Sequence, residues 1–204
     1  MNKLINFLIA LVGSSAAAGQ VSVGLDIGNE RLVADITVLH YLDSPKKWSV
    51  YSRNQGVSRH HDKTIGFATF SSFAYHSKPG IGVSVNLIGK TDRFYSTLGI
   101  YYEKKINHLS LYFLSMYALN SGSFNEIFIS ILYKYPLNKK TKIISQNEFY
   151  NSLRSWSHNL SYERLKLGVE LNKTQIGFFN ETFQSGEKFN LSLINHGLYL
   201  KQSF

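Results

Sequence analysis

The feature of this 204-residue chain that most limits its fold is an alternation of apolar and polar side chains at every second position. In residues 80–90, for example, Ile81, Val83 and Val85 alternate with Ser84 and Asn86. Successive side chains of a β-strand point to opposite faces, so this period predicts a strand with one apolar and one polar face. The pattern recurs along the chain with turn residues between its occurrences, which predicts an all-β, antiparallel protein.

The alternation predicts twelve strands, with ten as the alternative count. Their predicted ranges are 20–28, 31–42, 48–54, 63–77, 80–90, 93–104, 108–119, 124–136, 141–152, 157–172, 174–184 and 189–204. Residues 109–119 are apolar on both faces, so their pattern does not say which face points where. We see no interdomain linker and no repeat of fixed length, which favours a single domain.

The last predicted strand, residues 189–204, ends on an aromatic residue. Counting back from the end, Phe204 and Leu200 share one face, whereas Lys201 and Tyr199 lie on the other. One face is therefore suited to hydrocarbon and the other to a polar interior.

This ending resembles the C-terminal strand of bacterial outer-membrane β-barrel proteins, in which a final aromatic follows apolar residues at alternate positions. Gln202 and His196 depart from that pattern, because the family usually has apolar residues on this face. The resemblance implies a closed transmembrane barrel whose last strand pairs with the first. It also implies that Phe204 belongs to a signal read by the barrel-insertion machinery, and that the partner of the folded chain is the lipid bilayer of the outer membrane.

Residues 1–18 have the pattern of a cleavable signal peptide. Lys3 supplies the positive charge, residues 4–12 form an apolar run, and residues 16–18 offer an Ala-Ala-Ala cleavage site. The run is too short to span about 30 Å of hydrocarbon as a helix. We therefore expect an exported protein whose mature part, residues 19–204, is the barrel.

Composition agrees with an exported barrel and excludes several functions. The chain has 13 Tyr, 14 Phe and only 3 Pro, which favours strands. It has no cysteine, so neither a disulfide framework nor thiolate chemistry is available. The net charge of +9 would suit nucleic acid, but an export signal excludes that partner.

Lysine gathers in the turns on one side of the predicted barrel. An even number of strands puts both chain termini on the periplasmic side, where turns are short. The predicted periplasmic turns are residues 44–47, 78–80, 104–107, 137–140 and 172–174, and each contains lysine. The opposite side includes the longer predicted loops 54–63 and 151–158. A basic rim could meet anionic phospholipid head groups, or the lysines could simply be solvated turn residues.

Twelve charged side chains fall on the polar faces and are predicted to line the enclosed interior, which we call the bore. They are Arg31, Asp35, Lys90, Arg93, Glu103, Glu126, Lys134, Glu148, Arg164, Lys166, Glu170 and Glu181. Facing lipid would cost a Lys or Arg about 2–4 kcal/mol at the midplane, which favours the inward direction. Basic residues along an open bore would favour anionic solutes. Pairs of opposite charge would instead fill the barrel. The near balance of signs favours a structural barrel or a narrow passive pore for small solutes.

Two other functions are compatible with the sequence. His108 and Ser110 have the His-x-Ser spacing of barrel-embedded outer-membrane lipid hydrolases, and on a strand this spacing would let the imidazole act as a base toward the hydroxyl. The residues that flank that family's motif are missing. The remaining alternative is a soluble, secreted ligand-binding barrel whose apolar faces would turn inward.

We expect no metal and no cofactor. His60, His61 and Asp62 form the single cluster of ligand-type residues, and no second group at ligand spacing accompanies them. No glycine-rich phosphate loop or nucleophile elbow is present.

Overall fold

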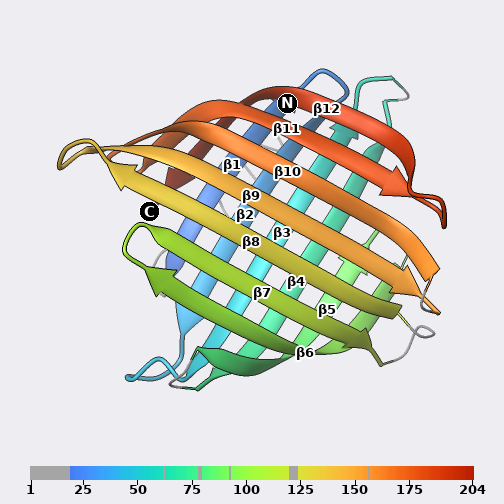
Figure 1. Cartoon of the computed structure of the whole chain (residues 1–204), viewed down its shortest axis with the longest axis horizontal. Coiled ribbons are helices and arrows are strands. Elements are labelled where there is room, and N and C mark those ends of the chain that lie inside the picture. Colours follow the sequence, from blue (N-terminus) through green and yellow to red (C-terminus); the bar gives the residue numbers. More distant parts are fainter. Residues whose placement is uncertain (1–18, 62, 78–79, 92, 120–123, 156) are drawn as a thin grey trace.

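The computed structural model describes residues 19–204 apart from residues 62, 78–79, 92, 120–123 and 156. These residues form twelve strands that close into one antiparallel barrel (Figure 1). The predicted fold class and the count of twelve are therefore confirmed, and the alternative of ten strands is wrong. The predicted signal peptide, residues 1–18, lies outside the described residues and stays a prediction.

Each strand pairs with its neighbours in sequence, and the last strand pairs with the first. The strands are β1 (Gln20–Gly28), β2 (Arg31–Tyr41), β3 (Trp48–Arg59), β4 (Ile65–His76), β5 (Ile81–Lys90), β6 (Arg93–Ile106), β7 (Leu109–Ala118), β8 (Phe124–Pro136), β9 (Thr141–Arg154), β10 (Ser157–Leu171), β11 (Thr174–Ser185) and β12 (Asn190–Ser203). The part of the chain that the structure describes contains no helix long and apolar enough to cross a membrane.

The barrel closes where β12 meets β1. Ser22 pairs with Ser203 at one end of this seam, and Gly28 pairs with Gly197 at the other. Beyond the last strand residue, the amide of Phe204 donates a hydrogen bond to the Val21 carbonyl at 2.9 Å. Closure removes every free strand edge, so the backbone groups of the sheet are satisfied without water.

The two longer loops predicted at the far end from the termini are mostly strand. β3 continues to Arg59, where the prediction ended it at residue 54, and its added residues pair with β2 on one side and β4 on the other. Likewise β9 runs to Arg154 and β10 starts at Ser157. The Asn, Gly and Ser residues of these segments are typical of loops, but pairing on both sides outweighs that local preference.

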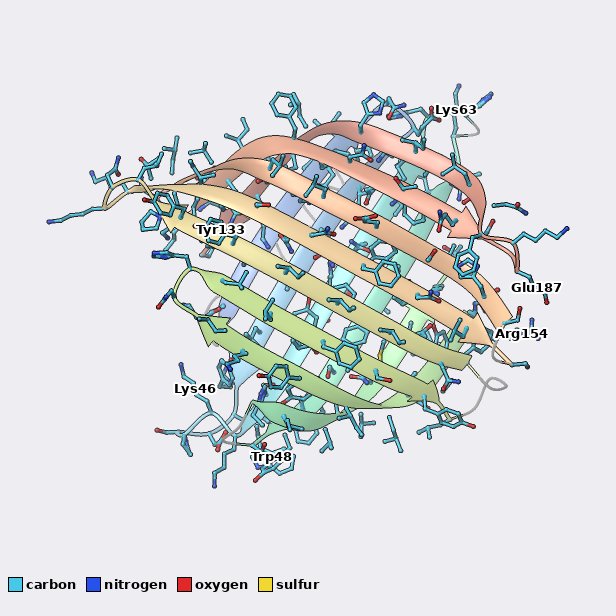
Figure 2. All side chains as sticks on the ribbon, viewed as in Figure 1. Lys46, Trp48, Lys63, Tyr133, Arg154 and Glu187 are labelled. Carbon is cyan, nitrogen blue, oxygen red and sulfur yellow. The ribbon has the colours of Figure 1, made fainter. Side chains whose placement is uncertain are left out.

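The outer surface of the barrel is mostly apolar, and charged side chains such as Lys46 and Glu187 lie at its two ends (Figure 2). Ile100 and Phe178 are 62% and 69% exposed, whereas Arg164 is only 4% exposed. Such large apolar side chains would be unfavourable in water around the whole barrel, but they suit a hydrocarbon environment. The apolar faces therefore point outward, opposite to what a soluble secreted barrel requires.

Candidate functional site in the barrel interior

A cavity of about 640 Å³ lies inside the barrel. Its lining comes from alternate residues of the strands, such as Asp35 of β2, Leu114 of β7 and Arg164 of β10. The period-two pattern of the sequence thus sets which side chains share this space.

The most deeply buried charge in the interior is the carboxylate of Glu181, which is 0% exposed. It accepts hydrogen bonds from Arg31 Nη2 at 2.9 Å, from Asn195 Nδ2 at 3.1 Å and from the guanidinium of Arg164. Two arginines and one amide thus surround one buried acid. A buried carboxylate is tolerated only because both of its oxygens accept hydrogen bonds or form ion pairs.

A second part of the network crosses the bore. Arg164 Nη1 lies 3.5 Å from Glu148 Oε2, and Glu148 Oε1 lies 3.6 Å from Arg53 Nη1. Arg53 also binds Asp35, with Nη2 at 2.6 Å from Oδ2. β3 carries Arg53 and β9 carries Glu148, and these strands are six positions apart either way round the ring of twelve. The Arg53–Glu148 contact therefore bridges opposite walls.

Lys166 and Lys201 add cations to the same region. Lys166 Nζ binds both carboxylate oxygens of Asp26, at 2.7 and 2.8 Å. Lys201 lines the cavity too, but within the described part of the chain no carboxylate lies within ion-pair distance of its ammonium group. Lys201 is thus the cation of this region that is left for a solute.

Another group of charges lies toward the end with the lysine-bearing turns. Glu170 accepts from Lys134 Nζ at 2.8 Å, from Lys142 Nζ at 2.6 Å and from Gln175 Nε2 at 2.9 Å. Glu103, also near this end, is exposed and lines the cavity.

Tyrosines hold the acid toward the other end of the barrel. Glu126 Oε1 accepts hydrogen bonds from the hydroxyl groups of Tyr95 and Tyr150, both at 2.6 Å. Lys90 lines the cavity beside them, with Nζ 5.9 and 5.8 Å from the centres of the two tyrosine rings. Arg93 is exposed and lies 5.6 Å from the centre of the Phe124 ring.

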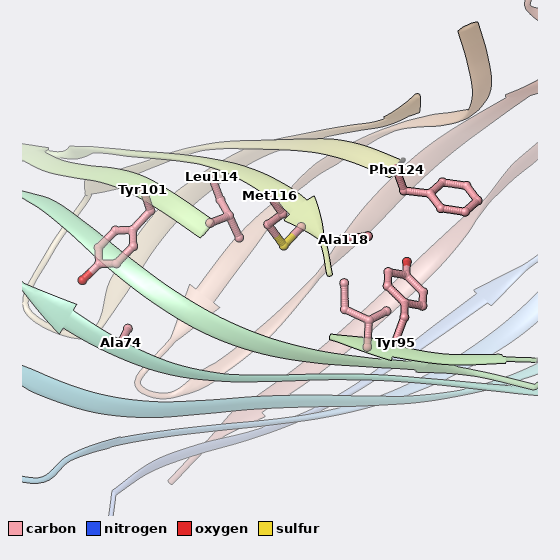
Figure 3. Packing of buried hydrophobic residues seen from close by; sticks show 8 residues of the cluster. Ala74, Tyr95, Tyr101, Leu114, Met116, Ala118 and Phe124 are labelled. Atoms are coloured by element: carbon pink, nitrogen blue, oxygen red, sulfur yellow. The ribbon is translucent and has the colours of Figure 1, made fainter. Parts of the chain in front are cut away.

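The remaining wall of the interior is apolar. A buried cluster from β4 to β8 comprises Ala74, Ile88, Tyr95, Tyr101, Leu114, Met116, Ala118 and Phe124, with Phe70, Tyr112 and Phe128 packed against it (Figure 3). We call this set the apolar wall. Most interior charges therefore lie on β1–β3 and β9–β12, and the apolar wall lies on β4–β8, which also carry Lys90, Glu103, Glu126 and Lys134.

Four interior charges were missed by the sequence analysis, namely Asp26, Arg53, Lys142 and Lys201. Arg53 shares its face with Ser49 and Tyr51, both of which line the cavity, so the alternation carried the signal. Lys201 was assigned to the polar face of the last strand but was not counted among the lining charges.

The proposed His-x-Ser pair is not formed, because His108 and Ser110 face opposite sides of the sheet. The His108 ring lies 5.8 Å from that of Tyr135, which is exposed on the outer surface. Ser110 shares its face with Tyr112, which lines the cavity. Asn107 and His108 make the turn between paired Ile106 and Leu109, so strand alternation does not extend to His108.

A different histidine and serine do meet, at the end of the barrel away from the chain termini. His158 Nε2 lies 3.1 Å from Ser161 Oγ, and its Nδ1 lies 2.6 Å from the Gly186 carbonyl oxygen. The ring of Phe189 stacks on the imidazole at 3.7 Å. These contacts cover both polar side chains and fasten the β11–β12 turn to β10, which is a structural role.

The histidine cluster at residues 60–62 shows no metal-site geometry in its described part. His60 Nε2 lies 3.0 Å from the Gly28 carbonyl oxygen, and Asp62 lies outside the described residues. Across residues 19–204 with their gaps, no three metal-ligating side chains gather.

The chain matches no known family model, and no curated protein sequence matches it. Several solved structures are similar to it. The KdgM porin in complex with disordered oligogalacturonate is similar with a TM-score of 0.56 and 10% identity, covering 91% of this chain and 98% of that one. The NanC porin is similar with a TM-score of 0.53 and 9% identity, covering 92% of this chain and 99% of that one. At these identities the likeness shows the fold, which is that of the bacterial outer-membrane β-barrels.

Proposed function

We propose that this protein is a narrow, passive channel of a bacterial outer membrane for small anionic solutes. The observation that carries the proposal is the cavity between Arg53, Arg164 and Lys201, enclosed by a barrel whose outer surface is apolar. A closed barrel with an apolar exterior and charged interior can hold a water-accessible path across lipid.

A preference for anions follows from which of the interior charges are paired with one another. Asp26, Asp35 and Glu181 each bind their cations at 2.9 Å or less, so their charge is largely compensated. Lys201 has no such partner among the described residues, and an arginine has five donors to offer. A passing anion therefore meets open donors in the middle of the bore, whereas Asp26, Asp35 and Glu181 there are already occupied.

The bridge across the bore makes the channel narrow. Glu148 touches Arg53 and Arg164 only at 3.6 and 3.5 Å, longer than the other ion pairs of the interior. The short hydrogen bond to Glu148 comes from an uncharged side chain, with Gln146 Nε2 at 2.9 Å. A solute carboxylate could replace Glu148 at Arg53 without breaking the tight pair between Arg53 and Asp35.

The similar structures support an anionic solute. One of the similar porins was solved with an oligogalacturonate, a chain of sugar carboxylates. The same fold here, with arginines and lysines in its interior, is suited to carboxylates in the same way.

The location and assembly follow from the same proposal. Export by residues 1–18 would deliver the chain to the periplasm, and the insertion machinery would read its last strand with Phe204. The turns containing Lys46, Lys139 and Lys173 would then face the periplasm and the anionic head groups there.

The test is conductance of the purified protein in a planar bilayer under a KCl gradient. We expect small, discrete current steps. Their reversal potential should lie nearer to the equilibrium potential of chloride than to that of potassium. Lys201→Gln should lower the chloride preference, whereas Lys173→Gln removes the same charge from an exposed turn and should leave it unchanged. Absence of current would indicate a structural barrel, and potassium preference would contradict the proposal.

A further inference from the structure

We propose that the bore takes amphipathic organic anions, meaning solutes with one anionic group and a compact apolar or aromatic body. This rests on the proposed function and names its substrate class. The inference comes from the division of the interior into a charged side and the apolar wall.

The apolar wall follows the length of the barrel. Figure 3 shows Ala74 and Tyr101 toward one end, Leu114 and Met116 in the middle, and Phe124 toward the other end. These five side chains come from β4, β6, β7 and β8, which lie in one continuous stretch of the sheet from β4 to β8. A solute moving through the bore would therefore meet apolar side chains on this side at both ends and in the middle.

Such a wall is unusual for a water-filled channel, because porin interiors are polar. Apolar side chains that face water gain free energy when another apolar surface covers them. Leu114 and Met116 are almost fully buried, but the rings of Phe70, Tyr112 and Phe128 pack against that cluster and are only partly buried. These three rings line the same cavity as the charges, so a solute there could cover them and stack against them.

The charged side of the cavity supplies the other half of the recognition. Arg53, Arg164 and Lys201 line it, and Lys201 has no carboxylate within ion-pair distance among the described residues. An anionic group would sit against these cations while the body of the solute lay against Phe70 and Phe128.

The size and chemistry of the cavity match this kind of solute. Its volume of about 640 Å³ is within the range of small-molecule sites, which are about 300–1,000 Å³, mostly apolar, with a few polar groups that fix orientation. A fully hydroxylated sugar acid of the same charge would have to turn hydroxyl groups toward the apolar wall, where they lose hydrogen bonds to water. The wall therefore favours an aromatic or aliphatic body over a sugar.

The experiment compares anions that share a head group. Benzenesulfonate and methanesulfonate are permanently charged and do not cross lipid as neutral acids, and gluconate represents a hydroxylated anion. Binding to the purified barrel in detergent is measured by equilibrium dialysis, and block of the chloride current is measured in planar bilayers. Phe70→Asn and Phe128→Asn remove apolar surface of the wall that borders the cavity. Leu98→Asn makes a similar change on the outer face of β6, where Leu98 is exposed.

We expect benzenesulfonate to bind about tenfold more tightly than methanesulfonate or gluconate, which corresponds to about 1.4 kcal/mol. This preference should fall in the two wall variants and persist in Leu98→Asn. Equal binding of the three anions, or tighter binding of gluconate, would overturn the inference while leaving a chloride-conducting channel intact. Preferential benzenesulfonate binding without any current would support the inference and overturn the channel.

Discussion

Arg53 and Glu148 meet across the full width of the barrel, with Nη1 and Oε1 3.6 Å apart, although their strands lie on opposite sides of the ring. Arg53 is held at its own wall by Asp35, and Glu148 is held at the other by Arg164 and Gln146. Each partner of the bridge therefore keeps a second contact when the bridge breaks. This arrangement suits a constriction that opens without unfolding the barrel.

Glu148→Gln should widen the path for anions. The variant removes a negative charge and weakens the bridge, while Arg53 keeps Asp35 and Arg164 keeps Glu181. We expect a larger single-channel conductance in KCl and a reversal potential shifted further toward the equilibrium potential of chloride.

The control for that variant is Glu187→Gln, which removes the same charge from an exposed side chain in the turn between β11 and β12. Conductance should be unchanged in this control. If Glu148→Gln also leaves both conductance and selectivity unchanged, the bridge does not limit the current.

Glu181→Gln should strongly destabilise the folded barrel. Glu181 is 0% exposed and compensates both Arg31 and Arg164, so its loss leaves the buried Arg164 and the half-buried Arg31 underpaired. Breaking a buried ion pair from one side costs about 3–5 kcal/mol. The measurement is the free energy of unfolding in urea with lipid vesicles, and Glu187→Gln in an exposed turn serves as control. A loss as small as that of the control would mean that this network contributes little.

Tyr150→Phe should cost about 1.5–3 kcal/mol of unfolding free energy, the usual contribution of a hydrogen bond to a charged group. Tyr150 donates at 2.6 Å to Glu126, which is 2% exposed. Tyr133→Phe removes a hydroxyl from an exposed ring on the outer surface and should be nearly neutral. Equal effects of the two changes would contradict the importance assigned to the Glu126 contacts.

Ile100→Arg tests the lipid-facing surface. Ile100 is exposed near the middle of β6, where an arginine facing hydrocarbon costs about 2–4 kcal/mol. Leu191→Arg, near the end of β12, should cost only about 0–1 kcal/mol, because arginine there reaches the interface. Unfolding free energies in vesicles give both values. A more costly substitution at residue 191 than at residue 100 would place the membrane elsewhere on the barrel.

The sequence predicted the features of the barrel that depend on local alternation, namely its strands and the direction of many of their side chains. Arg164 and Lys166 were placed inside because Leu165 and Leu167 occupy the other face, and twelve strands followed from the same period. Arg53 lay within the predicted strand 48–54, but its face was not assigned. That strand was ended too early because the Asn, Gln and Gly residues after Arg53 are typical of a loop, whereas β3 is held by pairing with both neighbours.

Contacts across the bore could not be predicted, since they depend on how the barrel closes. No local pattern brings Arg53 opposite Glu148, or Asp26 beside Lys166, which lie far apart in the chain. The apolar wall was hidden for a different reason. Residues 109–119 are apolar on both faces, so only the closed barrel shows that Leu114 and Met116 point inward.

Thiol labelling of two adjacent positions tests the central claim most directly, because the chain has no cysteine of its own. Ser130 lines the cavity, and the next residue, Ile131, is exposed on the outer surface. A negatively charged, water-soluble methanethiosulfonate reagent is added to Ser130→Cys and to Ile131→Cys during planar-bilayer recording. We predict that labelling lowers the chloride current of Ser130→Cys and leaves that of Ile131→Cys unchanged. A current that changes at residue 131 but not at residue 130 would contradict a charged bore enclosed by a lipid-facing apolar surface.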